Sequence, residues 1–151
     1  RNLNKYKKEM NKHQKLIIEK YIVGKELTVS VLELDHKIKP LAVTEILSKN
    51  NFFDYKAKYT KGFSKHIIPA KIPKIVHKKC LKYALNAHKI LKCKSISRSD
   101  FIYNQIDKKV YYLETNTQPG LTPISLVPEQ AYYKKITFDK IILELLKKAN
   151  E

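Results

Sequence analysis

Glycine is scarce in this chain. Among 151 residues there are only three, Gly24, Gly62 and Gly120, and they lie far apart. The loops that hold dinucleotides or the phosphates of ATP in many proteins need closely spaced glycines. The sequence therefore excludes a GxGxxG fingerprint and a Walker A loop, and any nucleotide must be bound without either.

Cysteine and long apolar segments are also scarce. Cys80 and Cys93 are too few for a disulfide framework and lack CxxC spacing, which favours a reducing, cytoplasmic compartment. The five histidines show no HExxH or other zinc-ligand pairing. No apolar run approaches the roughly 18 residues of a membrane span, and the first residues do not resemble a secretory signal. We expect a cytoplasmic protein with no membrane partner.

Acidic residues are outnumbered, because 14 aspartates and glutamates face 31 lysines and arginines, for a net charge of +17. Clustered basic residues can bind nucleic acid. However, the lysines are spread over the whole chain, and only Arg1 and Arg98 are arginines, the residue type that phosphate and base recognition favours. We expect no nucleic-acid partner, and a basic nucleic-acid-binding module is kept as an alternative.

The apolar pattern predicts an α+β fold, an antiparallel sheet with helices packed on one face. Strands are expected as a meander and a hairpin, at residues 16–22, 26–32, 38–47, 95–103 and 110–116. One helical stripe comprises Val76, Cys80, Tyr83, Ala84, Ala87, Ile90 and Leu91. A second follows a Thr137 cap and comprises Phe138, Ile141, Ile142, Leu145, Leu146 and Ala149.

The remaining segments are expected to be irregular. Residues 50–65 show neither the helical nor the strand period of apolar residues, and they are predicted to form a long functional loop. Residues 1–15 are polar and basic, and we interpret them as a linker or as the tail of a preceding subdomain, with residues 16–151 as one subdomain. Since the first residue is Arg1 rather than Met, we expect a fragment of a longer protein.

The predicted hairpin carries oxygen-bearing side chains at strand spacing. Glu114 and Asn116 are two residues apart and therefore leave the same face of the sheet. If the hairpin pairs Asp100 with Glu114, the same register places Arg98 opposite Asn116. Carboxylate and carboxamide oxygens suit Mg²⁺, and an adjacent arginine can bind phosphate or stabilise developing charge. The alternative is an exposed ladder of surface ion pairs.

A turn-rich loop leads from this hairpin into a helix. Ser125 is the expected N-cap, and Pro128 falls in the first turn. The free amides of a helix N-terminus bind anions, here a carboxylate. Gly120 lets its backbone amide approach a ligand closely, as an oxyanion donor does. The alternative is that Ser125 is only a cap and Gly120 only a turn residue.

Together these motifs resemble one family. From about Leu16 to its end, the chain resembles the C-terminal part of the D-alanine–D-alanine ligases, which belong to the ATP-grasp superfamily. The most specific block is E-x-N-T-x-P-G-hydrophobic-T at residues 114–122, followed by Ser-Leu-Val-Pro at 125–128. Residues 19–28, 54–59, 69–70 and 98–101, with Cys93, also match. Ser95 departs from the family pattern, which usually has glycine there.

The resemblance implies an ATP-dependent ligation through an acyl-phosphate that yields D-alanyl-D-alanine for peptidoglycan precursors. It implies two Mg²⁺ or Mn²⁺ ions bound by Asp100, Glu114 and Asn116, with Glu114 as the bridge. Arg98 and the Gly120 amide would stabilise the tetrahedral oxyanion. The second substrate's carboxylate would be held by Ser125 and the Leu126 amide.

The resemblance also implies a nucleotide site and a flap. The adenine would be bound by Glu19 and the backbone of Lys20, Tyr21 and Ile22, the ribose by Glu26, and the ring by an apolar slot of Ile22, Phe52 and Leu113. In a flap at residues 51–65, Lys58 would reach the phosphates and Tyr59 would close the first-alanine subsite. Tyr59 favours the dipeptide over D-alanyl-D-lactate.

Family members are longer than this chain, and their upstream half supplies further substrate and phosphate contacts. We therefore expect residues 1–151 to be inactive alone. The resemblance also implies that the full-length protein is a homodimer. The alternative within the superfamily is another ligase, such as a D-alanine–D-lactate ligase.

Overall fold

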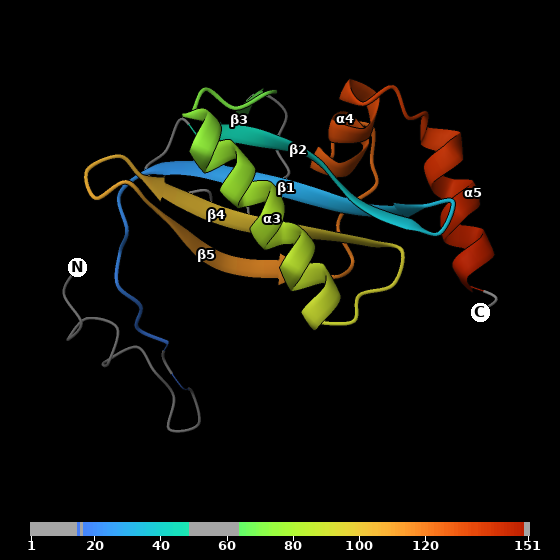
Figure 1. Cartoon of the computed structure of the whole chain (residues 1–151), viewed down its shortest axis with the longest axis horizontal. Coiled ribbons are helices and arrows are strands. Elements are labelled where there is room, and N and C mark those ends of the chain that lie inside the picture. Colours follow the sequence, from blue (N-terminus) through green and yellow to red (C-terminus); the bar gives the residue numbers. More distant parts are fainter. Residues whose placement is uncertain (1–14, 16, 49–63, 150–151) are drawn as a thin grey trace.

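The chain forms a five-stranded antiparallel sheet with strand order β3-β2-β1-β4-β5 (Figure 1). The computed structural model describes residue 15 and residues 17–48 and 64–149. The strands are β1 (Lys25–Leu34), β2 (Lys37–Ser48), β3 (Ser64–Ile67), β4 (Ile96–Asn104) and β5 (Lys109–Asn116). The helices of this part are α3 (Lys74–Ile90), α4 (Leu126–Tyr133) and α5 (Phe138–Ala149). The predicted α+β class and antiparallel sheet are confirmed.

β1 is the central strand, because β2 pairs with one of its edges and β4 with the other. The turn between β1 and β2 consists of Asp35 and His36, whose φ angles are 47° and 60°. Positive φ at both positions is what a two-residue hairpin turn of type I′ requires. The hairpin predicted from residues 26–32 and 38–47 is thus confirmed, with slightly longer strands.

The strand predicted at residues 16–22 is wrong. Residues 17–22 have no regular secondary structure, and the side chains of Ile17 and Ile18 are 87% and 70% exposed. The physical reason is that both edges of β1 are already occupied, so the apolar run that precedes it has no edge of that strand to pair with.

A short strand appears where a loop was expected. β3 pairs with the outer edge of β2, with Ser64 opposite Ser48 and Lys65 opposite Leu47, so the predicted loop at 50–65 extends two residues too far. Four residues are too few to show an alternating pattern in the sequence. The rest of that loop, residues 50–63, lies outside the described residues, as do residues 1–14.

The helices are divided between the two faces of the sheet rather than gathered on one. Leu27, Val29 and Val31 of β1 pack with α3, in a cluster that includes Val76, Cys80 and Ala84. Leu32, the next residue along, packs on the opposite face with Val127 of α4 and Ile141 of α5. Figure 1 shows α3 lying across the strands, whereas α4 lies near β2 and α5 lies beside the turn between β1 and β2.

The predicted stripe on α3 is correct at three positions and wrong at Tyr83, Ile90 and Leu91, which are exposed. Val76, Cys80 and Ala84 are buried, whereas Ile90 is 78% exposed. The next buried position belongs to His88, whose Nδ1 lies 2.8 Å from the Ser97 hydroxyl of β4. Burial lowers the pKa of His88, partly offset by the carboxylate of Glu33.

The last helix begins as predicted. The amide of Lys140 donates to the Thr137 hydroxyl at 3.3 Å, so Thr137 caps α5. Ile141 is buried, but Phe138 and Leu146 of the predicted apolar stripe are 45% and 59% exposed. None of the helices in the described ranges is long and apolar enough to cross a membrane.

Candidate functional site

The register predicted for the hairpin of β4 and β5 is confirmed. Asp100 lies opposite Glu114, and Arg98 lies opposite Asn116. Between Asp100 and Phe101 the register shifts, so that Leu113 is an extra residue in β5. The four polar side chains therefore share one patch, on the face of the sheet opposite α3.

The Asp100 carboxylate is held from two sides. Arg98 Nε donates to its Oδ1 at 3.0 Å and Arg98 Nη2 to its Oδ2 at 2.9 Å. The Thr28 hydroxyl, from the facing position of β1, donates to Oδ1 at 2.6 Å. A carboxylate offers about four lone-pair sites, so one site remains, on Oδ2. Asp100 is thus oriented by its neighbours and keeps room for one further ligand.

Glu114 and Asn116 complete a hard-oxygen donor set. Glu114 is exposed, and the Asn116 side-chain oxygen accepts a hydrogen bond from the Gln118 amide at 2.8 Å. In the described part of the chain, no three histidine, cysteine, aspartate or glutamate side chains form a metal-binding group. The donor set is therefore two carboxylates and one amide, which fits Mg²⁺ because that ion binds few protein oxygens and completes its shell with phosphates.

Ser125 occupies the N-cap position of α4, as predicted, but its hydroxyl does not cap the helix. Instead, Ser125 Oγ accepts from the Thr122 amide at 3.1 Å and lies 2.8 Å from the Thr122 hydroxyl. A Cβ added to Gly120 would lie 3.0 Å from the same Oγ. Gly120, Thr122 and Ser125 thus form a tight turn directly before Leu126, the first residue of α4.

The candidate nucleotide residues are only partly brought together. Glu26 lies on β1 opposite Ile102, two residues from the position that faces Asp100, and therefore on the same face of the sheet. Leu113 is 50% exposed at the β5 bulge. Glu19, Lys20 and Tyr21 are exposed and Ile22 is half-buried, in the segment before β1. Phe52, Lys58 and Tyr59 lie outside the described residues.

Sequence reasoning missed two residues that support this site. Thr28 holds Asp100, and Gln130 of α4 binds the backbone of β1. Thr28 carries no distinguishing signal, because polar residues alternate with apolar ones in this part of β1, as Glu26 and Ser30 show. Gln130 carries none, because its partners are about a hundred residues away in the chain.

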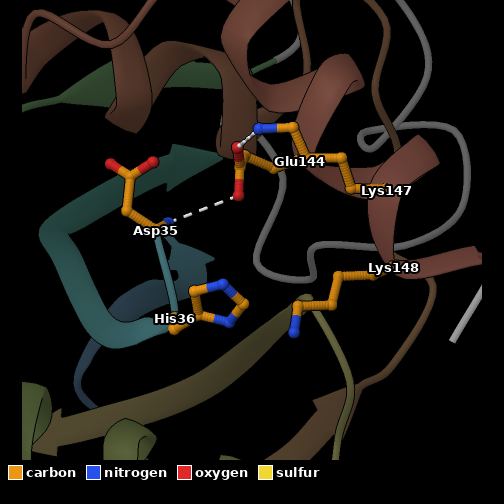
Figure 2. Close-up of a pocket in the computed structure, with 5 residues that line it drawn as sticks. All are labelled: Asp35, His36, Glu144, Lys147 and Lys148. Atoms are coloured by element: carbon orange, nitrogen blue, oxygen red, sulfur yellow. Dashed lines mark hydrogen bonds and ion pairs between the residues drawn. The ribbon is translucent and has the colours of Figure 1, made fainter.

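A pocket of about 340 Å³ lies elsewhere, between the β1–β2 turn and α5 (Figure 2). Glu144 Oε2 accepts from the Asp35 amide at 3.3 Å, and Lys147 donates to Glu144 Oε1 at 2.7 Å. The hydrogen bond from Lys147 lowers the pKa of the Glu144 carboxyl. These groups satisfy one another and tie α5 to the turn, so the pocket has a structural role.

Comparisons with known proteins point to one family. Residues 1–147 match the family described as D-ala D-ala ligase C-terminus. The D-alanine–D-alanine ligase of Caulobacter vibrioides is 43% identical over 136 residues, which are 90% of this chain and 42% of that protein.

Two solved structures resemble the fold. The D-alanine–D-alanine ligase from Bacillus anthracis complexed with ATP is 32% identical with a TM-score of 0.67, over 86% of this chain and 41% of that one. The VanG D-Ala:D-Ser ligase from Enterococcus faecalis is 31% identical with a TM-score of 0.68, over 84% of this chain and 36% of that one. The chain spans less than half the length of these relatives.

Proposed function

Since this chain belongs to the family described as the D-Ala D-Ala ligase C-terminus, we propose that it is the C-terminal part of an enzyme that joins two D-alanines using ATP. The observation that supports this most directly is the patch on β4 and β5, where Asp100 faces Glu114 and Arg98 faces Asn116. In this proposal the boundary between a linker and the catalytic subdomain lies near residue 15.

The reaction proceeds in two steps. The carboxylate of the first D-alanine attacks the γ-phosphorus of ATP, which releases ADP and forms an acyl-phosphate. The amine of the second D-alanine then attacks the carbonyl carbon, and the tetrahedral intermediate collapses with loss of phosphate and a proton to give the dipeptide. The negative oxygen of that intermediate is stabilised by the Arg98 guanidinium and the Gly120 amide.

Asp100, Glu114 and Asn116 would hold Mg²⁺ or Mn²⁺, with Glu114 between two ions. When bound, the ions neutralise charge on the phosphoryl group during transfer. The bidentate contact from Arg98 fixes the Asp100 carboxylate so that its remaining lone pair faces a single direction. The chain itself thus orients the ligands in advance.

The second substrate's carboxylate is assigned to the turn before α4. Backbone amides at a helix N-terminus attract anions, and the Leu126 amide is one of them. Ser125 Oγ, held by Thr122, would present its hydroxyl to the same carboxylate. Tyr59 and Lys58 are assigned to the first-substrate subsite and the phosphates.

The nucleotide is assigned to the segment before β1 and the open face beside it. Glu19 and the backbone of Lys20, Tyr21 and Ile22 would bind the adenine, and Glu26 the ribose. The ring would lie in a slot formed by Ile22, Phe52 and Leu113. A carboxylate and backbone N–H and C=O groups match the donors and acceptors on the edge of a purine, without a glycine-rich loop.

The experiment uses the full-length protein that contains this chain. Release of ADP and formation of D-alanyl-D-alanine are measured with ATP, Mg²⁺ and D-alanine, by a coupled assay and by mass spectrometry of the product. We expect both, and no turnover with residues 1–151 alone. Absence of D-alanine-dependent ADP release by the full-length protein contradicts the proposal.

A second candidate differs only in the second substrate. It is favoured by the likeness to the VanG D-Ala:D-Ser ligase, and it includes D-lactate as an acceptor. Offering D-alanine together with D-serine or D-lactate in the same assay separates the candidates by the mass of the product. We place the full-length enzyme in the cytoplasm. We also propose that it is a homodimer, and sedimentation analysis tests this oligomeric state.

A further inference from the structure

Gln130 binds α4 to the centre of the sheet. Its side chain is fully buried. The Oε1 atom accepts from the Ser30 amide at 2.9 Å, and Nε2 donates to the Thr28 carbonyl at 3.2 Å and to the Thr44 hydroxyl at 3.0 Å. Both N–H groups and the oxygen of the carboxamide are therefore used in these contacts.

These contacts lie where the pairing of β1 with β2 is interrupted. The register shifts between Val29 and Val31, and such a bulge leaves backbone groups without ladder partners. Gln130 supplies partners for the Ser30 amide and the Thr28 carbonyl at this point. Because a buried unpaired amide is costly, these hydrogen bonds fix the position of α4 relative to β1.

Thr28 connects this junction to the polar patch. Its side chain is fully buried, and its hydroxyl donates to Asp100 Oδ1 at 2.6 Å. Its carbonyl is the group that Gln130 binds. One residue thus contacts both the helix that begins at Leu126 and the carboxylate of Asp100.

We propose that Gln130 and Thr28 are positioning residues, which hold the N-terminus of α4 and the Asp100 carboxylate at a fixed separation. This inference rests on the proposed function, in which one substrate binds at Ser125 and a cation at Asp100. Gln130 lies only five residues after Ser125, so a shift of the helix moves the carboxylate subsite with it. Displacements of about 1 Å reduce catalysis strongly.

The first test is Thr28→Val in the full-length enzyme, which removes the hydroxyl and keeps the side chain's shape. We expect the Mg²⁺ concentration at half-maximal velocity to rise about 10-fold, with the KM for D-alanine nearly unchanged. Independently of turnover, binding of Mn²⁺ in the presence of a non-hydrolysable ATP analogue, followed by electron paramagnetic resonance, should weaken by a similar factor.

The second test is Gln130→Met, which removes all three hydrogen bonds at similar volume. We expect the KM for the second D-alanine to rise about 10-fold, with a smaller change in the Mg²⁺ requirement. If this variant does not fold, Gln130→Glu keeps the acceptor for the Ser30 amide and, because a buried carboxyl is protonated, one of the two donors. The KM for the second D-alanine should then rise by less.

Ser97→Ala is the matched control, because it removes a buried hydroxyl contact on the α3 face, to His88. It should lower the melting temperature without changing KM or metal binding. If Thr28→Val and the folded Gln130 variants behave like this control, the positioning role is overturned. If the wild-type enzyme forms no dipeptide, the proposed function fails. The positioning role is tested separately by Mn²⁺ binding, and normal binding by Thr28→Val overturns it.

Discussion

Arg98 and Asp100, two residues apart on β4, bind each other through two hydrogen bonds of 3.0 and 2.9 Å. Their side chains are only 13% and 18% exposed, so the pair is shielded from competing water. A bidentate contact of this kind fixes orientation as well as charge. It leaves Glu114, across the hairpin, as the exposed carboxylate of the patch.

Glu114→Gln in the full-length enzyme should abolish measurable turnover, by at least about 100-fold. The amide keeps the shape of the side chain but lacks the charge that a divalent cation requires. Because Glu114 is exposed on β5, the circular dichroism spectrum and the melting temperature of the variant should match those of the wild type. Turnover at the wild-type rate refutes the metal assignment.

Gly120→Ala should impair binding of the second substrate. The added Cβ would lie 3.0 Å from Ser125 Oγ, so the Ser125 side chain must move and weaken its contact with Thr122. We expect a rise of about 10-fold in the KM for the second D-alanine, measured by initial rates. Gln118→Ala, at an exposed position of the same loop, is the control and should leave this KM unchanged.

Gly24→Ala should destabilise the sheet. A Cβ at this position would lie 2.4 Å from the Tyr103 carbonyl oxygen and 2.7 Å from a methyl carbon of Ile102, so β1 would have to move away from β4. The expected loss in the free energy of unfolding is about 1–3 kcal/mol, measured by urea denaturation. A change below about 0.5 kcal/mol is inconsistent with the close approach.

Stability should fall in mild acid because of His88. Burial lowers its pKa in the folded state, so the unfolded chain binds the proton more readily. The contribution of neutral His88 is complete above about pH 6.5 and is lost as the pH falls through the folded-state pKa. Urea denaturation at pH 8, 6 and 5 measures this loss.

His88→Gln should flatten that pH dependence over the same range. His77, whose pKa is lowered by burial and by Lys134, retains part of it. An unchanged slope in the His88 variant shows that other groups are responsible.

More of the candidate site than of the surrounding fold could be predicted from the sequence. The spacing of Arg98 from Asp100 and of Glu114 from Asn116 shows which side chains share a face, and this could be read from the sequence. The pairing of Asp100 with Glu114 could only be assumed, because the register at the turn, continued without a bulge, places Asp100 opposite Leu113. The apolar run at 17–22 also resembles a strand locally. Whether an edge of β1 is free to receive it depends on β4, about 75 residues later in the chain, and a local pattern does not show this.

The supporting contacts were beyond sequence reasoning for a related reason. The hydrogen bonds of Thr28 and Gln130 join residues 72 and 102 positions apart. They also depend on an irregularity in the pairing of β1 with β2. A bulge forms where the packing of both strands and of α4 requires it. The residues near Gln130 in the sequence therefore do not indicate its partners.

The division of helices between the two faces has a consequence for how such sequences can diverge. Along β4, Ser97, Ser99 and Phe101 belong to the α3 face, whereas Arg98 and Asp100 belong to the other. Neighbouring positions of β4 therefore meet different physical requirements. On the α3 face a substitution must keep volume and the hydrogen bonds of Ser97 and Ser99, whereas at Arg98 and Asp100 it must keep charge and reach. We expect the kind of substitution that β4 accepts to alternate from one position to the next, with a period of two.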